Sequence, residues 1–267
     1  MTDSAKILTE TALTRIALTE DLTEDAFLGG QLRLRQPRSG HRAGHDAMLL
    51  AAATPARPGH RVVEFGAGVG AAGLAVASRV AGIKLVLVEI DAGLAGLARE
   101  NAAANAIAAE TIVLDVASTA AAFAGVGLGP DSVDVVLTNP PFNDAFRHRA
   151  SPDKALAHVA DASTLESWIH AARRILKSGG VLSLIWRADA IAEVLAALDR
   201  GFGSLAILPV HGDAARPAIR VLVRAVKGGK APTQILAGLM LNDESAVPDK
   251  GVQAILTGKG VLPLAIP

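Results

Sequence analysis

Between residues 62 and 186 the chain alternates short apolar runs with segments of helical length, and this alternation limits the possible folds more than any other feature. Nearly continuous apolar strands separated by helices are typical of a parallel sheet that is covered on both faces. The sequence therefore predicts a doubly wound α/β fold. The expected strands are Val62 to Phe65, Leu85 to Glu89, Thr111 to Leu114, Val133 to Thr138 and Val181 to Trp186.

The pattern changes after Trp186. A helix is expected over residues 188–198, and two apolar runs follow, Leu205 to Val210 and Ile219 to Val226. Because a short polar loop joins these two runs, they must form antiparallel strands. The prediction is a seven-stranded, mostly parallel sheet that ends in an antiparallel hairpin. The other expected helices are Ala71 to Val80, Ala92 to Asn105, Ser118 to Phe123 and Leu165 to Leu176, with one more starting near Asp46.

Three regions are expected along the chain. Residues 1–30 form an acidic N-terminal arm, since residues 1–28 hold six acids and two bases, and this arm is expected to be weakly structured or to add a helix. Residues 31–230 form the α/β domain. Residues 231–267 form an apolar, proline-containing C-terminal extension, for which the pattern indicates no role.

Composition excludes several classes of function. The 26 basic and 26 acidic side chains cancel, which argues against capture of nucleic acid or membrane by net charge. No apolar stretch reaches the ~20 residues needed to cross a bilayer, and no secretion signal is recognisable, so a cytoplasmic protein is expected. The lack of cysteine excludes disulfides and thiolate chemistry. His41 and His45 lack a third ligand nearby, so no metal site is expected.

A glycine-rich loop follows the first expected strand. Gly66, Gly68 and Gly70 come directly after Glu64 and Phe65, and a helix is predicted to start next. Glycine lets the backbone approach a ligand closely, and a helix N-terminus offers free N–H groups. With Ala71, the same loop also fits a loose dinucleotide fingerprint. The loop therefore indicates a nucleotide-like ligand without identifying it.

Two acids end the next two strands. Glu89 lies 23 residues after Gly66, where an acid can accept both ribose hydroxyls of a nucleotide. Asp115 closes the third strand and can accept from an adenine amino group, although an acid at this position is often only a helix cap. Neither residue distinguishes S-adenosylmethionine from a nicotinamide cofactor.

The fourth strand ends in Asn139, Pro140, Pro141 and Phe142, which are predicted to form the catalytic site. Two successive prolines remove two backbone donors, so the carbonyls of Asn139 and Pro140 have no competing N–H beside them. The amide oxygen of Asn139 adds another acceptor. Together these groups suit a planar amino group, and Phe142 offers a face for a flat substrate.

These motifs resemble the cofactor and catalytic motifs of class I methyltransferases that modify exocyclic amino groups. Residues 40–52 and 217–232 look most like the bacterial enzymes that methylate adenine N6 in the anticodon loop of valine transfer RNA. The resemblance implies that the glycine loop holds the methionine part of S-adenosylmethionine and that Glu89 holds its ribose. It also implies that Asn139 and Pro140 orient the amino group. Asp46 is expected above the cofactor, with a helix N-cap as an equal alternative.

Other substrates remain open. Protein glutamine methyltransferases and ribosomal guanine-N2 methyltransferases share the catalytic motif, and a nucleotide-binding protein without methyl transfer is a further alternative. The glutamine enzymes carry a sizeable helical N-terminal domain, whereas about 60 residues precede the first strand here. Transfer RNA adenine is therefore the first choice.

Binding of RNA predicts local basic surfaces. Two stretches of the chain, residues 31–44 and 214–232, are basic and hold no acid, and a third basic cluster lies at 147–149. Residues 143–164 form a polar connection long enough to serve as a lid. Trp168 and Trp186 are expected in the core. The residues predicted to contact RNA are Arg33, Arg35, Arg147, Arg220, Arg224 and Lys227.

Overall fold

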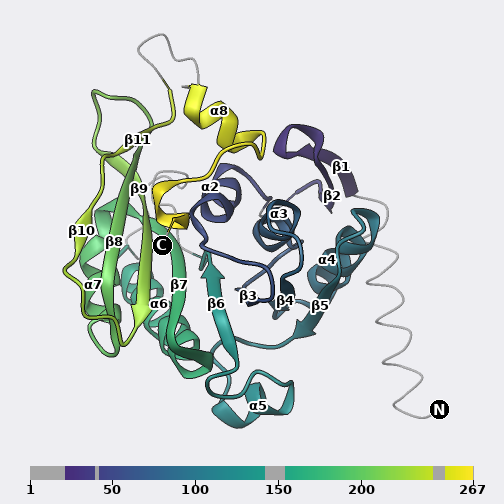
Figure 1. The fold of residues 1–267 in the computed structure, drawn as a ribbon, viewed down its shortest axis with the longest axis horizontal. Helices are drawn as coiled ribbons and strands as arrows, with labels where there is room; N and C mark the ends of the chain where they lie inside the picture. The colour runs from purple at the N-terminus through teal and green to yellow at the C-terminus, as the bar shows by residue number, and fades with distance from the viewer. Residues whose placement is uncertain (1–21, 40–41, 142–153, 243–249, 267) are drawn as a thin grey trace.

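A mixed sheet of nine strands forms the centre of the molecule (Figure 1). The computed structural model describes residues 22–39, 42–141, 154–242 and 250–266, and of residues 154–162 only the backbone. Along the sheet the strands lie in the order β10-β8-β9-β7-β6-β3-β4-β5, with β11 also paired to β8. All seven predicted strands are present: β3 (Arg61–Phe65), β4 (Lys84–Glu89), β5 (Ala109–Val113), β6 (Val133–Thr138), β7 (Leu176–Arg187), β8 (Phe202–His211) and β9 (Ala218–Lys227).

The sheet reverses its direction of growth at β3, which pairs in parallel with β4 on one side and β6 on the other. Such a switch point places a crevice outside the carboxyl ends of the strands, where open α/β sheets bind their ligands. Phe65 and Thr138 are neighbours in the register of β3 and β6. The glycine loop and the Asn139 segment therefore leave adjacent strands at the same edge. The terminal pair β8 and β9 is antiparallel, as predicted.

Helices cover both faces of the sheet and create two apolar cores (Figure 1). One core contains buried side chains of α2, α3 and α4, and the other contains those of α5, α6 and α7. Continuous apolar strands such as β4 bury both faces, which explains why they show no polar alternation. The helices are α2 (His45–Ala53), α3 (Ala71–Arg79), α4 (Ala92–Ala104), α5 (Ala120–Gly125), α6 (Lys154–Ile175) and α7 (Ile191–Leu198), which follows the 3-10 turn η2 (Ala188–Ala190).

The predicted lid over residues 143–164 is wrong for its second half, because α6 begins at Lys154. Alanine and leucine are frequent between residues 154 and 165, and both favour helix. The first half of the expected lid, with Arg147, lies outside the described residues, and so does Phe142, which precedes it.

The predicted acidic arm is also partly wrong. Strand β1 (Leu22–Phe27) pairs with β2 (Leu32–Pro37) in an antiparallel hairpin around the turn η1 (Leu28–Gly30). Phe27, Leu32 and Leu34 are buried in the core that includes α2, α3 and α4. Burial of these side chains, which lie far in sequence from their partners, holds the hairpin in place. The hairpin thus begins before the expected boundary at residue 31.

The C-terminal extension is built into the same core. Strands β10 (Gln234–Ile235) and β11 (Leu239–Met240) lengthen the sheet beside β8. Helix α8 (Lys250–Leu256) and turn η3 (Pro263–Ala265) pack on α2, and the N–H of Leu262 donates to the carbonyl of Ala52 at 2.9 Å. Among the described residues, no helix is long and apolar enough to cross a membrane.

Candidate active site

Asn139 stands at the carboxyl end of β6, beside the glycine loop. Thr138 precedes it and is buried, and its hydroxyl donates to the carbonyl of Phe65 at 3.2 Å, which joins β6 to β3. The side-chain oxygen of Asn139 is buried and accepts no hydrogen bond from any described residue. Because a buried amide oxygen without a donor costs free energy, this atom is an acceptor available to a ligand. Pro140 is buried and Pro141 is exposed.

The glycine loop requires glycine for two different reasons. Gly66, Gly68 and Gly70 have φ angles of 63°, 54° and 86°, a region that other residues rarely adopt. A side chain at Gly70 would meet Leu87 at 3.0 Å, so this glycine lets α3 approach the sheet. A side chain at Gly68 would meet no atom within 4 Å. The loop therefore packs inward at Gly70 and is open for a ligand at Gly68.

Trp168 on α6 contributes to this site, although its spacing predicted a core position. A Cβ at Gly66 would lie 2.5 Å from the edge of its ring, so the indole packs directly on the glycine backbone. Trp168 is half-buried, whereas Trp186 is fully buried as predicted. In the sequence, Trp168 is distinguished from core residues only by being one of two tryptophans, which is too weak a signal to place it at the loop.

Glu89 holds the open side of the glycine loop. Its two oxygens accept from the N–H groups of Gly68 at 2.7 Å and Asp91 at 3.0 Å, and the residue is only 6% exposed. A carboxylate oxygen can accept two hydrogen bonds, so Glu89 retains acceptor capacity for hydroxyl donors. Asp91 in turn caps α4 by accepting from the N–H of Leu94. One strand-end carboxylate thus fixes the loop and still suits a ribose.

Glu64 acts beneath the loop. It is buried, and its carboxylate accepts from the N–H of Gly73 in the first turn of α3 at 2.7 Å. A Cβ at Gly73 would lie 2.7 Å from that oxygen, so only glycine fits here. Burial raises the pKa of Glu64 to about 8, against the lowering effect of the Gly73 hydrogen bond. Glu64 therefore positions the loop from below by tying β3 to α3.

The raised pKa of Glu64 predicts a pH-dependent stability. Because the folded protein holds this proton more tightly than the unfolded chain, the contribution of Glu64 is complete below pH 4.5 and is lost as pH rises towards 8. The slope is on the order of 1 kcal/mol per pH unit. Glu64→Gln keeps an acceptor for Gly73 but cannot ionise. This variant is expected to lack the dependence of the free energy of unfolding on pH that Glu64 causes. Urea unfolding of the unmodified protein and of Glu64→Gln between pH 5 and pH 8.5 measures this. If the free energy of unfolding changes equally with pH in the two proteins, the prediction is refuted.

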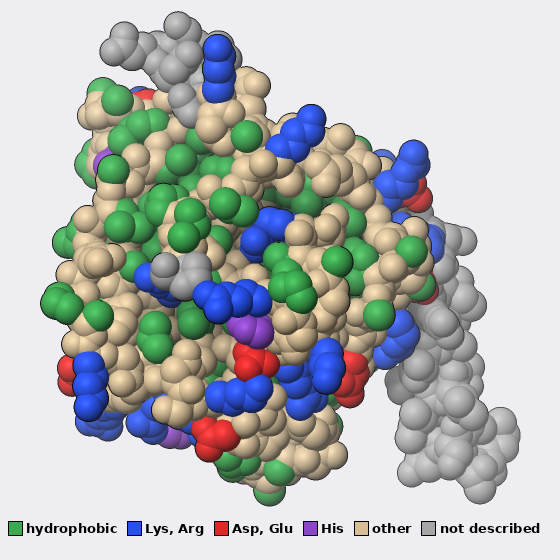
Figure 2. All heavy atoms as spheres, viewed as in Figure 1, with side chains coloured by type: hydrophobic (Ala, Val, Ile, Leu, Met, Phe, Trp, Pro, Cys, Tyr) green, Lys and Arg blue, Asp and Glu red, His purple; other side chains and the backbone are tan. Residues whose placement is uncertain are grey.

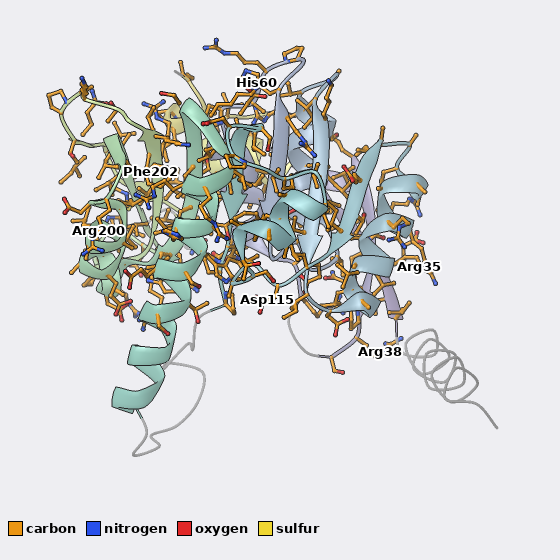
Figure 3. All side chains as sticks on the ribbon, turned by 90° about the horizontal axis from the view of Figure 1, so that it is seen from below. Arg35, Arg38, His60, Asp115, Arg200 and Phe202 are labelled. Atoms are coloured by element: carbon orange, nitrogen blue, oxygen red, sulfur yellow. The ribbon has the colours of Figure 1, made fainter. Side chains whose placement is uncertain are left out.

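The edge next to Glu89 suits a flat base. Asp115 follows β5, is exposed, and accepts from the N–H of Ala117 at 2.8 Å. The N–H of Leu114 donates to the carbonyl of Glu89, which joins the two strand ends. Ile90, directly after Glu89, is 63% exposed and supplies apolar surface there. Ile90 was not predicted to belong to the site. The signal for it in the sequence is that an apolar residue directly follows the acid at the end of a strand. In Figure 3, Asp115, which follows β5, and His60, which precedes β3, lie at opposite ends of the strands.

Asp46 lies in the first turn of α2 but does not cap it, since the N-cap is Gly44. Its carboxylate accepts from Nε of Arg220 at 3.1 Å. Arg220 is the register neighbour of Arg187, the last residue of β7, so this ion pair sits at the same edge as Asn139. Arg220, predicted to contact RNA, is therefore engaged with an acid of its own chain.

The other predicted RNA contacts do not form one basic track. Lys227 lies at the opposite edge, because it bonds the carbonyl of Leu176, the first residue of β7, and pairs with Asp131. Arg224 donates to two carbonyls of the C-terminal segment. Lys227, predicted to contact RNA, therefore lies away from Asn139, since the antiparallel course of β9 carries it to the other end of the strands. Arg33 and Arg35 are exposed and pair with Glu24 and Glu100. In the lower half of Figure 2, basic side chains likewise stand beside acidic ones.

Comparison with known proteins identifies the family. Residues 39–212 match the family model described as the methyltransferase small domain, which covers more than half of the chain. The chain belongs to the methyltransferase small domain family. A tRNA1(Val) (adenine(37)-N6)-methyltransferase of Dickeya chrysanthemi is 27% identical over 89% of this chain and 94% of its own length. A crystal structure from Agrobacterium tumefaciens, titled a predicted O-methyltransferase, is 32% identical with a TM-score of 0.69, and the match covers 81% of this chain and 98% of that one.

One further relative of this methyltransferase is more partial. The ribosomal RNA small subunit methyltransferase C of Citrobacter koseri is 30% identical over 58% of this chain and 39% of its own length. The family, the doubly wound fold and the methyltransferase neighbours make the chain an S-adenosylmethionine-dependent methyltransferase. Its residues fit that cofactor, because the loop is open at Gly68 and Glu89 keeps acceptor capacity beside it.

Trp168 offers a spectroscopic check on this site. Because its half-buried ring packs on Gly66, binding of S-adenosylmethionine is expected to change its fluorescence in a saturable way. Trp186 is fully buried and serves as the internal control. Trp168→Phe should abolish the response while calorimetry still detects binding. A full response from the variant would place the cofactor away from Trp168.

Proposed function

We propose that the chain methylates the N6 amino group of an adenine in RNA, most specifically in the anticodon loop of a transfer RNA. The observation that carries this proposal is the buried side-chain oxygen of Asn139, without a donor among the described residues, beside the glycine loop. Support for the substrate comes from the Dickeya relative, which matches over nearly its whole length and is named for adenine-N6 methylation of transfer RNA. The cytoplasm, where transfer RNA is found, is the compartment this function requires.

The proposed chemistry uses position rather than a strong base. S-adenosylmethionine would supply an electrophilic methyl group, whose bond to sulfur breaks as the bond to nitrogen forms, so that S-adenosylhomocysteine leaves. The lone pair of an adenine amino nitrogen is delocalised into the ring, which makes it a poor nucleophile. The side-chain oxygen of Asn139 and the carbonyl of Pro140 would accept hydrogen bonds from its two N–H groups, favour a tetrahedral nitrogen and direct the lone pair at the methyl carbon. Orientation of this kind can supply several kcal/mol of the barrier. The methylated nitrogen then releases its surplus proton to water.

The proposed acceptor geometry also separates nitrogen from oxygen substrates. A hydroxyl carries one proton, which a base must remove before attack, whereas an amino group offers two donors to two carbonyl acceptors. Asn139 and Pro140 supply two such carbonyl acceptors. Asp46, an acid at this end of the sheet, is already paired with Arg220. An exocyclic amino group is therefore favoured over a hydroxyl.

Guanine N2 in ribosomal RNA and the side-chain amide of a protein glutamine present the same planar amino group, so the substrate is tested directly. Transfer RNA, ribosomal RNA and protein extract are each incubated with the enzyme and methyl-labelled S-adenosylmethionine, followed by mass spectrometry of nucleosides and peptides. Label in transfer RNA as N6-methyladenosine is expected. Label confined to N2-methylguanosine or to glutamine would overturn the proposed substrate. Asn139→Ala is the background control.

A further inference from the structure

The outer edge of strand β2 is paired with two asparagine side chains, one on helix α4 and one at its C-cap, instead of another strand. The N–H and carbonyl of Arg33 bond the amide of Asn105 at 2.9 and 2.8 Å. The N–H and carbonyl of Arg35 bond the amide of Asn101 at 2.8 and 3.0 Å. Residues four apart on a helix rise about 6 Å and residues two apart on a strand about 6.6 Å, so the two amides match successive outward peptide groups. Each amide thus replaces a peptide of a third strand.

Asn101 alone also reaches the glycine loop. Its Nδ2 donates to the carbonyl of Val69 at 3.0 Å, in addition to the carbonyl of Arg35. A primary amide has two N–H donors, so both are used, and its oxygen accepts from Arg35. Asn101 is fully buried, and it lies in an alanine-rich tract of the sequence. Aspartate lacks the donors and alanine lacks every polar group, so neither can replace it.

The loop is therefore held from two sides. Glu89 fixes the N–H of Gly68, and Asn101 fixes the carbonyl of Val69, the next residue. Gly68 is the open position of the loop, so the carbonyl of Val69 lies one residue from the place where a ligand can approach. A shift of β2 would therefore displace this carbonyl through the side chain of Asn101, which bonds both.

We propose that the N-terminal hairpin is part of the cofactor site and that Asn101 is the positioning residue that couples the two. The hairpin, residues 22–37, lies outside the part of the chain that matches the family model. Coupling of this kind is reciprocal, so that cofactor binding stabilises the docked hairpin as much as the docked hairpin favours binding. The inference concerns the cofactor and is independent of which base is methylated.

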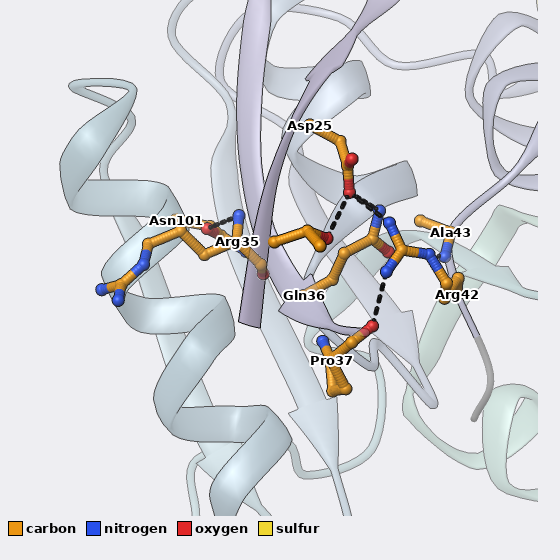
Figure 4. Close-up of polar contacts among 8 residues, drawn as sticks. Asp25, Arg35, Gln36, Pro37, Arg42, Ala43 and Asn101 are labelled. Carbon is orange, nitrogen blue, oxygen red and sulfur yellow. Dashed lines mark hydrogen bonds and ion pairs between the residues drawn. The ribbon is translucent and has the colours of Figure 1, made fainter. Parts of the chain in front are cut away.

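A second set of contacts holds the hairpin without Asn101 (Figure 4). The carboxylate of Asp25 accepts from Gln36 at 2.7 Å and from Arg42, and Arg42 also donates to the carbonyl of Pro37. The Gln36 oxygen accepts from the N–H of Ala43, just before α2. These bonds attach the hairpin to the chain leading into α2, so a variant of Asn101 is expected to keep it folded.

The test compares Asn101→Ala with Asn105→Ala. Both variants lose an equivalent pair of bonds to β2. Asn105→Ala also loses the bond from its Nδ2 to the carbonyl of Asn101 at 2.8 Å, and only Asn101→Ala releases Val69. Calorimetry is expected to show an increase of about tenfold in the Kd for S-adenosylmethionine for Asn101→Ala and less than about twofold for Asn105→Ala. The KM for the cofactor should rise in parallel with little change in kcat. Equal effects in the two variants, or no effect in either, would overturn the proposal.

A second measurement uses the unmodified protein and does not depend on variant stability. The N–H of Arg35 is bonded by Asn101, so its hydrogen exchange reports on docking of β2. Saturating S-adenosylmethionine is expected to slow exchange at Arg35. Exchange at Arg35 that is unchanged by the cofactor would show that hairpin and loop are not coupled.

Discussion

Asn139→Ala is expected to lower the rate of methyl transfer by about a hundredfold to a thousandfold, by analogy with removal of one preorganised hydrogen-bonding group from other active sites. The variant loses the buried oxygen that would accept a hydrogen bond from the amino group, and no described residue supplies a substitute. Asn139 bonds no residue of the glycine loop in the described structure, so the Kd for S-adenosylmethionine should change less than about twofold. Single-turnover rates with labelled cofactor, together with calorimetry, measure both quantities.

Asn105→Ala is the matched control for this result, because it removes an asparagine amide at the C-cap of α4, away from the carboxyl end of β6. Its transfer rate should stay close to that of the unmodified protein. Two outcomes contradict the role assigned to Asn139. One is retained turnover, and the other is a loss of cofactor affinity as large as the loss of rate.

Glu89→Ala should raise the Kd for S-adenosylmethionine by about a hundredfold, since charge-assisted hydrogen bonds are the stronger ones and several are lost together. The carboxylate holds the N–H groups of Gly68 and Asp91, so its removal frees the loop and deletes the acceptors for the ribose. Glu89→Gln keeps one acceptor oxygen and should have an intermediate effect. Titration calorimetry of the three proteins provides the comparison.

The control for Glu89 is Glu100→Ala, which removes an exposed carboxylate of α4 that pairs with Arg35. Exposed ion pairs contribute little, so affinity should not change. If Glu89→Ala binds the cofactor as tightly as Glu100→Ala does, Glu89 has no part in holding it.

Features with a local cause were predictable from the sequence. Strand β6 occupies the predicted residues 133–138, because a run of apolar residues ends at a polar segment with two prolines. The glycine loop also followed from its own residues, since Gly66, Gly68 and Gly70 all adopt positive φ. In both cases the residues that decide the conformation are adjacent in the chain.

Features that depend on distant partners were missed. The hairpin of β1 and β2 is held by burial and by Asn101, more than 60 residues away. Trp168 contacts the glycine loop only because α6 places its ring against Gly66. Acid-free stretches of arginine predicted a basic surface, but Arg35 meets Glu100 and Arg220 meets Asp46, which lie far away in sequence. A run of like charges in the chain therefore does not predict a run of like charges on the surface.

The central claim, methyl transfer to an adenine amino group held by Asn139 and Pro140, is tested most directly by removing that amino group from the substrate. Two anticodon stem-loop RNAs are compared under single-turnover conditions, one with adenine after the anticodon and one with unsubstituted purine at that position. We predict N6-methyladenosine in the first RNA and no methylation of the second. Equal methylation of both RNAs, or a methyl group found on a ribose oxygen, would contradict the account.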